Sequence, residues 1–365
     1  MLEKYGHGGD LTTAEELYGR PTQKWLDFSA NMNPLGPPES VQSVLERFGE
    51  HIGRYPDPRV RGLRQKIAEK YRIPVESIWV GNGAAECIDG IVKYLRPASA
   101  AVTSPAFTEY EDALHKVDAK VTHIPLRAEQ DYRLIAEDLP PAGNMDLYMI
   151  GHPNNPTGRT VEARLIKNLL EQGETVVLDE AFIDFQPEEE ELTFIRIAAQ
   201  HPRCFVIRSM TKFYTIPGIR LGFAVSHPDH IAALMKQQIP WSVNGLAQMI
   251  GEEVLGDDGY AERTLLWLAE EREWFRRQLQ ETGLICYPSE TNFLLLELPA
   301  RSGWTAPLAQ RWLARRGILI RDASLFYGLH ERCLRTAIRL REENAVLVSA
   351  LRDMLASEPE GGGEE

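Results

Sequence analysis

The sequence predicts an α/β fold that combines a large domain, built on a mostly parallel sheet, with a smaller α+β domain. Short apolar runs alternate with helical segments from about residue 41 to residue 247, which is typical of strands linked by crossover helices. Polar residues follow several of these runs, where the carboxyl ends of parallel strands face a ligand. With 365 residues, the chain is also too long for one compact core.

The predicted domain boundaries follow changes in composition along the chain. The charge-rich residues 252–281 are expected to be helical, and residues 291–298 and 334–340 are predicted strands of the smaller domain. The expected parts are an N-terminal arm of residues 1–40 that joins the small domain and the active site, a large domain of 41–250, a small domain of 251–356, and a disordered tail of 357–365, which cannot bury apolar surface.

A glycine turn follows the first predicted strand of the large domain. Residues 77–80 (Ser-Ile-Trp-Val) are the predicted strand, and the chain then passes through Gly83, Ala84 and Ala85 into a helical stretch. The first N–H groups of a helix have no partner within the helix, so this turn is a candidate phosphate site. It lacks the lysine of a nucleotide-binding loop and the spacing of a dinucleotide fingerprint, which disfavours a nucleotide.

Two further strands are expected to present polar side chains at their ends. Residues 147–150 run into a loop containing Asn155, in the motif Asn-Pro-Thr-Gly, which taken alone is also compatible with a simple turn. Residues 175–178 are a short apolar run that ends at Asp179. We therefore expect Asn155 and Asp179 to lie at the same edge of the sheet.

Lys212 is the candidate nucleophile. It follows Ser209 in the segment Ser-Met-Thr-Lys, and Arg220 lies eight residues further along the chain. A lysine amine condenses with an aldehyde only when part of it is neutral, and a nearby cation or an apolar wall lowers its pKa toward that state. A single lysine is more often a solvated surface residue, so this interpretation depends on the surrounding motifs.

The ordered set of glycine loop, Asn-Pro-Thr-Gly, strand-end aspartate, lysine and arginine resembles the fold-type I pyridoxal-phosphate enzymes of the aspartate aminotransferase superfamily. The resemblance covers nearly the whole chain. It implies pyridoxal 5'-phosphate as the cofactor, Lys212 as the Schiff-base lysine, Asp179 as the partner of the pyridine nitrogen, and Asn155 as a donor to the phenolic oxygen of the ring. A carboxylate that keeps the pyridine protonated makes the ring an electron sink.

The same resemblance assigns further cofactor contacts. Phe107 matches the aromatic residue that stacks on the ring, although packing in the core is an open alternative for this side chain. Tyr55 resembles the tyrosine that crosses a dimer interface to reach the cofactor phosphate of the other subunit, which implies a homodimer with shared active sites. The residues that match the phosphate cup are Ala84, Ala85, Ser209 and Arg220, with Gly83 in the same turn.

Within the superfamily, the N-terminal signature resembles the threonine-phosphate decarboxylases of cobalamin biosynthesis. This signature consists of His-Gly-Gly-Asp at 7–10 and the segment at 27–36. Phe182 replaces the superfamily's tyrosine three residues after Asp179, so one hydroxyl donor is missing. The implied reaction is decarboxylation of L-threonine O-3-phosphate to (R)-1-aminopropan-2-yl phosphate, and the alternative is transamination by a histidinol-phosphate aminotransferase.

The resemblance also implies a set of substrate contacts. Arg335 matches the arginine that binds the α-carboxylate, and Arg321 matches a ligand of the substrate phosphate. His7 is a second candidate for that phosphate, with a solvated terminus as the alternative. Asn33 is expected to help hold the carboxylate. Strand alternation puts Arg339 on the same face as Arg335 but roughly 13 Å away, so Arg339 is the more remote candidate.

Composition and charge argue against several other classes of protein. The net charge of −13 disfavours nucleic acid and anionic membranes as partners. No apolar stretch is long enough to span a bilayer and the N-terminus lacks a signal-peptide core, so we expect a cytoplasmic protein. A cofactor-sensing regulator would need an effector segment, and no basic helix-turn-helix precedes residue 41 or follows the small domain. The cysteines at 87, 204, 286 and 333 lack paired spacing, which indicates neither a metal site nor disulfides.

Overall fold

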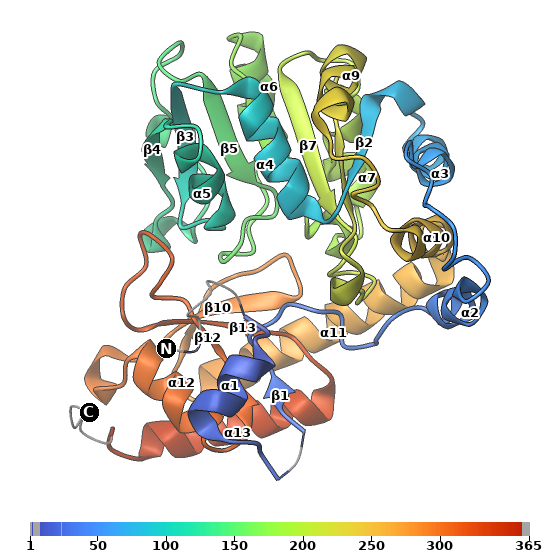
Figure 1. Ribbon diagram of the computed structural model, residues 1–365. Helices are drawn as coiled ribbons and strands as arrows, with labels where there is room; N and C mark the ends of the chain where they lie inside the picture. Colours follow the sequence, from blue (N-terminus) through green and yellow to red (C-terminus); the bar gives the residue numbers. More distant parts are fainter. Residues whose placement is uncertain (1, 3–7, 23, 360–365) are drawn as a thin grey trace.

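A computed structural model describes residues 2, 8–22 and 24–359. The large domain surrounds a seven-stranded sheet, and the smaller domain packs against the carboxyl edge of that sheet (Figure 1). The long helix α11 (Asp258–Glu281) runs from the large domain along the small one. This two-domain α/β architecture confirms the predicted fold class.

The large sheet is parallel except for one strand. β8 is antiparallel to both of its neighbours, β2 and β7, and the other adjacent pairs are parallel. In spatial order the strands are β2 (Ile78–Gly81), β8 (Gly222–Val225), β7 (Cys204–Ser209), β6 (Val176–Asp179), β5 (Leu147–Gly151), β3 (Ser99–Ser104) and β4 (Lys120–Pro125).

Helices cover both faces of this sheet. Apolar side chains of α4 (Ala84–Leu95), α5 (Glu109–His115) and α9 (Pro228–Gln237) form one core with β6 and β7. A larger core on the opposite face continues into the small domain. The remaining large-domain helices are α2 (Glu39–Phe48), α3 (Arg61–Tyr71), α6 (Ala163–Glu171), α7 (Glu189–Leu192), α8 (Ile195–Ala198) and α10 (Gly245–Val254).

Strand alternation decides which residues face the α4 and α5 side. Val177 of β6 and Ile207 of β7 belong to the core beneath these helices, whereas Leu178 and Val206 belong to the opposite core. Successive side chains of a strand point to opposite faces. The next odd-numbered positions, 179 and 209, therefore lie on the α4 and α5 side, and position 208 lies on the other.

The small domain combines a four-stranded sheet with helices from both ends of the chain. β1 (Leu26–Asp27) pairs in parallel with β11 (Ile318–Leu319), so the N-terminal segment joins this domain. The sheet order is β12 (Arg321–Asp322), β13 (Cys333–Ala337), β10 (Phe293–Glu297) and β9 (Ile285–Cys286), and the accompanying helices are α1 (Leu11–Tyr18), α12 (Ala306–Ala314) and α13 (Arg341–Ala356).

The last predicted strand is shorter than the sequence pattern suggests. It ends at Ala337 rather than at residue 340, because the backbone N–H groups of Arg339 and Leu340 donate to Asn344 Oδ1 and Glu343 Oε2 at the start of α13. In the expected tail, Ser357 is held by a 3.2 Å hydrogen bond from Trp304 Nε1, and residues 360–365 lie outside the described part. Over the described residues, none of the helices combines the length and apolar character needed to cross a bilayer.

Candidate active site

The carboxyl ends of β5, β6 and β7 open into a cavity of about 110 Å³. Because parallel strands end at the same edge, segments that are far apart in the sequence meet here. Sequence reasoning did not identify Tyr110 or Thr211 as lining residues. The predicted cofactor residues that line the cavity are Ala84, Ala85, Phe107, Asn155, Asp179, Ser209, Lys212 and Arg220.

Lys212 presents its amine to this cavity from the loop after β7. Its Nζ donates to Thr211 Oγ1 at 3.2 Å. Desolvation, followed by the positive charges of Arg220 and Arg335, lowers the pKa of Lys212 to about 8, while the charge of Asp179 acts in the opposite direction. Roughly a tenth of the amine is therefore neutral at pH 7, far more than for a solvated lysine, and a nucleophilic amine must be neutral.

Asp179 ends β6 and is only 7% exposed. Its Oδ2 accepts a hydrogen bond from the Tyr110 hydroxyl at 2.7 Å, and its Oδ1 accepts one from the Ala181 N–H at 3.0 Å. Burial raises the pKa of Asp179, whereas these two bonds and the charge of Lys212 lower it. The carboxylate is thus fixed in orientation while its environment is largely apolar.

The start of α4 and Arg220 form a tightly packed cup. Gly83 adopts φ = +86°, and a Cβ at this position would lie 2.6 Å from Arg220 Nη2. A Cβ at Gly222 would lie 2.5 Å from the Ala84 nitrogen. Free N–H groups at a helix start, together with a guanidinium, suit a phosphate dianion, so these residues fit the phosphate of pyridoxal phosphate.

Ser209 completes this side of the cavity. Its Oγ lies 2.9 Å from Thr211 Oγ1, so two hydroxyls stand between the cup and the lysine. Phe107 lies beside the cavity with its ring 5.8 Å from that of Tyr110, in an edge-to-face arrangement. Phe107 therefore both lines the cavity and packs against the core beneath α4 and α5.

Arg335, on β13 of the small domain, contacts the cavity residue Asn155 from behind the residues that line the cavity. It is 6% exposed, and its Nη1 donates to Asn155 Oδ1 at 2.6 Å while its Nη2 donates to the Ser29 carbonyl oxygen at 2.7 Å. These contacts bring together the N-terminal arm, the Asn-Pro-Thr-Gly loop and the small domain. They also orient the Asn155 amide, because an oxygen that accepts from Arg335 leaves the amide nitrogen to face another acceptor.

Arg321 lies directly beside Arg335 in the small sheet. The two residues are paired across β12 and β13, and Arg321 is 3% exposed. Its guanidinium carbon lies 5.4 Å from the centre of the Phe326 ring. Like charges directly opposite each other in a sheet are destabilising.

Two other predicted substrate residues point elsewhere. The Asn33 amide nitrogen donates to Tyr260, Thr264 and Phe213, and its Oδ1 accepts from the Leu35 N–H. The backbone N–H of Asn33 donates to the Lys212 carbonyl oxygen at 3.1 Å. Asn33 therefore holds the N-terminal arm against the loop that carries Lys212. This amide has no capacity left for a substrate carboxylate.

Arg339 is also engaged outside the cavity. Its Nη2 forms a 2.8 Å ion pair with Glu343, and its Nη1 donates to the Asp27 carbonyl oxygen at 3.1 Å. The alternation argument does not extend to this residue because β13 ends two positions earlier. His7, the remaining predicted substrate residue, lies outside the described residues.

Tyr55 is far more exposed than the other predicted site residues. It is 83% exposed, and its ring lies 5.0 Å from that of Trp241, which is 48% exposed. Tyr55 does not line the cavity of its own chain. Two adjacent exposed aromatic rings are typical of a surface that contacts another protein.

The comparison with known families matches this arrangement. Residues 23–351 match the family described as aminotransferase class I and II, which is most of the chain. The chain belongs to this family. A threonine-phosphate decarboxylase from Salmonella typhimurium is 38% identical over 358 residues, covering 96% of this chain and 96% of that protein.

Solved structures of this family include two close neighbours in fold. A histidinol-phosphate aminotransferase from Clostridium acetobutylicum has a TM-score of 0.84 and 29% identity, covering 91% of this chain and 99% of that chain. L-threonine-O-3-phosphate decarboxylase from Porphyromonas gingivalis has a TM-score of 0.82 and 27% identity, covering 91% of this chain and 100% of that chain. Backbone similarity alone therefore does not separate the two activities.

Phe182 gives the cavity an apolar side chain three residues after Asp179. It lines the cavity, and its ring packs edge-to-face on Phe293 at 4.9 Å. The position therefore contributes an apolar wall and no hydroxyl donor. This wall adds to the desolvation that lowers the pKa of Lys212.

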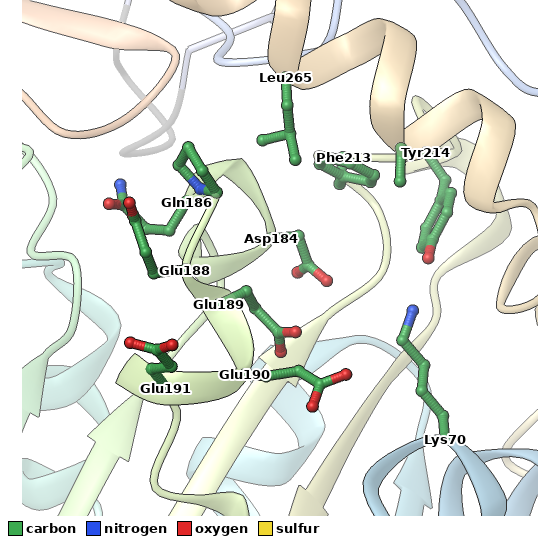
Figure 2. Close-up of a pocket in the computed structure, with 12 residues that line it drawn as sticks. Lys70, Asp184, Gln186, Glu188, Glu189, Glu190, Glu191, Phe213, Tyr214 and Leu265 are labelled. Atoms are coloured by element: carbon green, nitrogen blue, oxygen red, sulfur yellow. The ribbon is translucent and has the colours of Figure 1, made fainter.

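A larger cavity of about 400 Å³ lies on the other face of the same segments (Figure 2). Figure 2 shows Asp184, Glu189 and Glu190 on one side of it and Lys70 and Tyr214 on the other. None of the predicted site residues within the described part lines this cavity. Its excess of carboxylates is unfavourable for a phosphorylated ligand, so the smaller cavity is the candidate active site.

Proposed function

We propose that this protein is a pyridoxal-phosphate-dependent decarboxylase that converts L-threonine O-3-phosphate to (R)-1-aminopropan-2-yl phosphate, a reaction used in cobalamin biosynthesis. The observation that carries the proposal is the 38% identity to the Salmonella decarboxylase over 96% of the chain, against 29–31% for histidinol-phosphate aminotransferases compared in the same way. The geometry of the cavity supports the same cofactor for either activity.

The cavity residues fit the proposed cofactor group by group. Asp179 would pair with the pyridine nitrogen, Asn155 with the phenolic oxygen, and Phe107 with the ring face, while Ser209, Arg220 and the start of α4 would hold the phosphate. When bound, pyridoxal phosphate supplies an electron sink for charge that develops at the substrate Cα. Lys212 would hold the cofactor covalently through its amine.

Arginines of the small domain would bind the two anionic groups of the substrate. Arg335 donates to Asn155 in the cavity wall and to the Ser29 carbonyl oxygen, and its planar guanidinium would exchange these contacts for the two oxygens of the substrate carboxylate. Arg321, paired with it across the sheet, would bind the substrate phosphate. Two fixed arginines thereby set the orientation of the Cα substituents, and that orientation selects the bond that breaks.

Lys212, or a water bound in the cavity, would return a proton to Cα as a general acid. Carbon dioxide leaves with the loss of the Cα–carboxyl bond, whose electron pair stays at Cα, and a proton delivered from Lys212 Nζ gives the amine product. The pKa of about 8 means that this amine holds or releases a proton near neutral pH.

The decisive experiment supplies L-threonine O-3-phosphate without a keto acid and measures carbon dioxide. We expect release from the phosphate ester and little from free threonine, because each charge-assisted bond to a desolvated phosphate contributes about 1.5–3 kcal/mol. The preference in kcat/KM should reach at least roughly a hundredfold, and Arg321→Ala should remove most of it. Equal use of both compounds would contradict the proposal.

Transamination of histidinol phosphate is the second candidate, and the TM-score of 0.84 to the Clostridium aminotransferase favours keeping it. Keto-acid-dependent consumption of histidinol phosphate, faster than carbon dioxide release from threonine phosphate, would establish this activity instead. The two assays use the same purified protein and give opposite outcomes.

We further propose a homodimer in which Tyr55 contacts the cofactor phosphate of the partner subunit. The exposure of Tyr55 and its contact with Trp241 support a role at a subunit interface. Mixing an inactive Tyr55 variant with Lys212→Ala under conditions that exchange subunits should restore activity, because one site of each mixed dimer would be intact. Absence of recovery after verified exchange would count against a shared site.

A further inference from the structure

Tyr110 stands out among the cavity residues because the predicted cofactor chemistry does not use it. It is the second residue of α5 and is 2% exposed. Its hydroxyl donates to Asp179 Oδ2 at 2.7 Å across 69 residues of sequence. The other carboxylate oxygen accepts the Ala181 N–H, so each oxygen of Asp179 has one fixed donor.

The phenol can only act as a donor in this contact. Desolvation, and then the negative charge of Asp179, raise the pKa of Tyr110 well above its ordinary value of 10.0. The hydroxyl therefore keeps its proton throughout the neutral range. Among the influences that keep Asp179 ionised against the effect of burial, the bond from Tyr110 is the largest.

We propose that Tyr110 is a positioning residue that holds Asp179 ionised and aimed at the pyridine nitrogen of the cofactor. This inference rests on the proposed cofactor but is independent of which phosphorylated substrate is used. An ionised Asp179 keeps the pyridine nitrogen protonated, and the protonated ring is the stronger electron sink. Tyr110 thereby acts on the chemistry through Asp179.

Packing alone is a competing role for this residue, since Tyr110 belongs to the core beneath α4 and α5. The chain offers a matched control in Tyr148 of β5, which is fully buried and whose hydroxyl has no hydrogen-bond partner among the described residues. Tyr110→Phe and Tyr148→Phe remove the same atom from buried sites. Only the first removes a bond to Asp179.

The test reconstitutes the protein with pyridoxal phosphate labelled with ¹⁵N in the ring. In the parent protein, we expect the ¹⁵N resonance of a protonated pyridine. Tyr110→Phe should move this resonance toward the unprotonated position and weaken cofactor affinity by roughly tenfold, the loss of one charge-assisted hydrogen bond. Tyr148→Phe should leave both measurements unchanged.

A double-mutant cycle separates action through Asp179 from a general loss of packing. In an Asp179→Asn background, Tyr110→Phe should change cofactor affinity by less than about twofold. If Tyr110→Phe does not fold, p-aminophenylalanine at this position keeps the shape with a weaker donor, and a smaller displacement of the same resonance is expected.

The outcomes distinguish this inference from the proposed function. A parent protein that binds no pyridoxal phosphate would overturn the cofactor proposal itself. A parent that binds it with a protonated nitrogen, combined with an unchanged ¹⁵N resonance in Tyr110→Phe or in the aminophenylalanine variant, would overturn the role of Tyr110 alone.

Discussion

Neighbouring residues at the carboxyl edge of the large sheet serve opposite purposes on its two faces. On one face, Asp179 and Ser209 line the cavity with Lys212. On the other, Glu180 and Arg208, each adjacent in sequence to one of them, are buried in a charge cluster. Arg208 contacts Asp184 at 2.7 Å, Glu189 at 2.7 Å and Glu180 at 3.3 Å.

The two faces differ in whether the charged side chains are paired with other side chains of the protein or face a cavity. Arg208 has its three carboxylate partners within the protein, and burial raises the pKa of Glu180 to about 7 while the charge of Arg208 opposes that shift. On the cavity face, Arg220 and Lys212 line a cavity that fits an anionic ligand. Similar residue types therefore stabilise the fold on one side and bind a ligand on the other.

The largest expected effect on turnover follows from removing the Lys212 amine on the cavity face. Lys212→Ala should abolish turnover and prevent borohydride from attaching pyridoxal phosphate covalently to the protein. Mass spectrometry of the reduced parent protein should place the label on Lys212. A label on another lysine would show that the cavity has been assigned the wrong nucleophile.

The next largest effect is a difference in turnover between variants of two adjacent carboxylates, Asp179 and Glu180. Asp179→Asn should lower turnover by several orders of magnitude while cofactor binding remains measurable, because the charge opposite the pyridine nitrogen is lost. Glu180→Gln should leave turnover per folded molecule within a few fold, since Glu180 faces the Arg208 cluster. Similar kinetic losses in both variants would remove the distinction between the two faces.

Removing each arginine tests the same distinction through stability. Arg208→Met leaves buried carboxylates without their cation and should lower the free energy of unfolding by about 3–5 kcal/mol. Arg220→Met should change the stability of the cofactor-free protein far less and weaken pyridoxal-phosphate binding instead. Denaturant unfolding and cofactor titration of both variants measure these effects, and equal stability losses would contradict the comparison.

The smallest expected effect is on the free energy of unfolding, which the burial of Lys212 lowers in the cofactor-free protein. Its pKa falls from 10.5 to about 8 on folding, so the unfolded chain binds more protons between these values and stability rises with pH across this window. Without cofactor, Lys212→Met should therefore stabilise the protein near neutral pH by about 1–2 kcal/mol, allowing for partial exposure. The gain should shrink toward pH 10.5. A gain independent of pH would indicate a packing effect.

Much of the site could be predicted because its residues belong to local patterns. Asn155, Asp179 and Ser209 each follow an apolar run, and parallel strands bring such positions to one edge. The glycine turn before α4 is equally local, since a positive φ at Gly83 and free N–H groups at a helix start involve only neighbouring residues.

Two predicted substrate residues that do not belong to such local patterns form hydrogen bonds outside the cavity. Asn33 was expected near the substrate, but its amide is used by Tyr260 and Thr264 of α11, more than 220 residues away in sequence. Arg339 was placed by extending strand alternation beyond Ala337, where β13 ends, and its charge pairs with Glu343. Side-chain hydrogen bonds of this kind depend on which elements pack together, which periodicity does not specify.

The sequence by itself determined the α/β class and the order of the strand-end residues, because these follow from the short-range periodicity of strands and turns. The roles of Lys212 and Arg220 came from the spacing of their motif and the family that it resembles. Only the tertiary structure decided that Arg321 and Arg335 lie opposite each other and that Tyr110 donates to Asp179. The register of the small sheet and the packing of α5 on β6 fix these contacts. Both join residues whose proximity arises only when separate elements assemble around a common core.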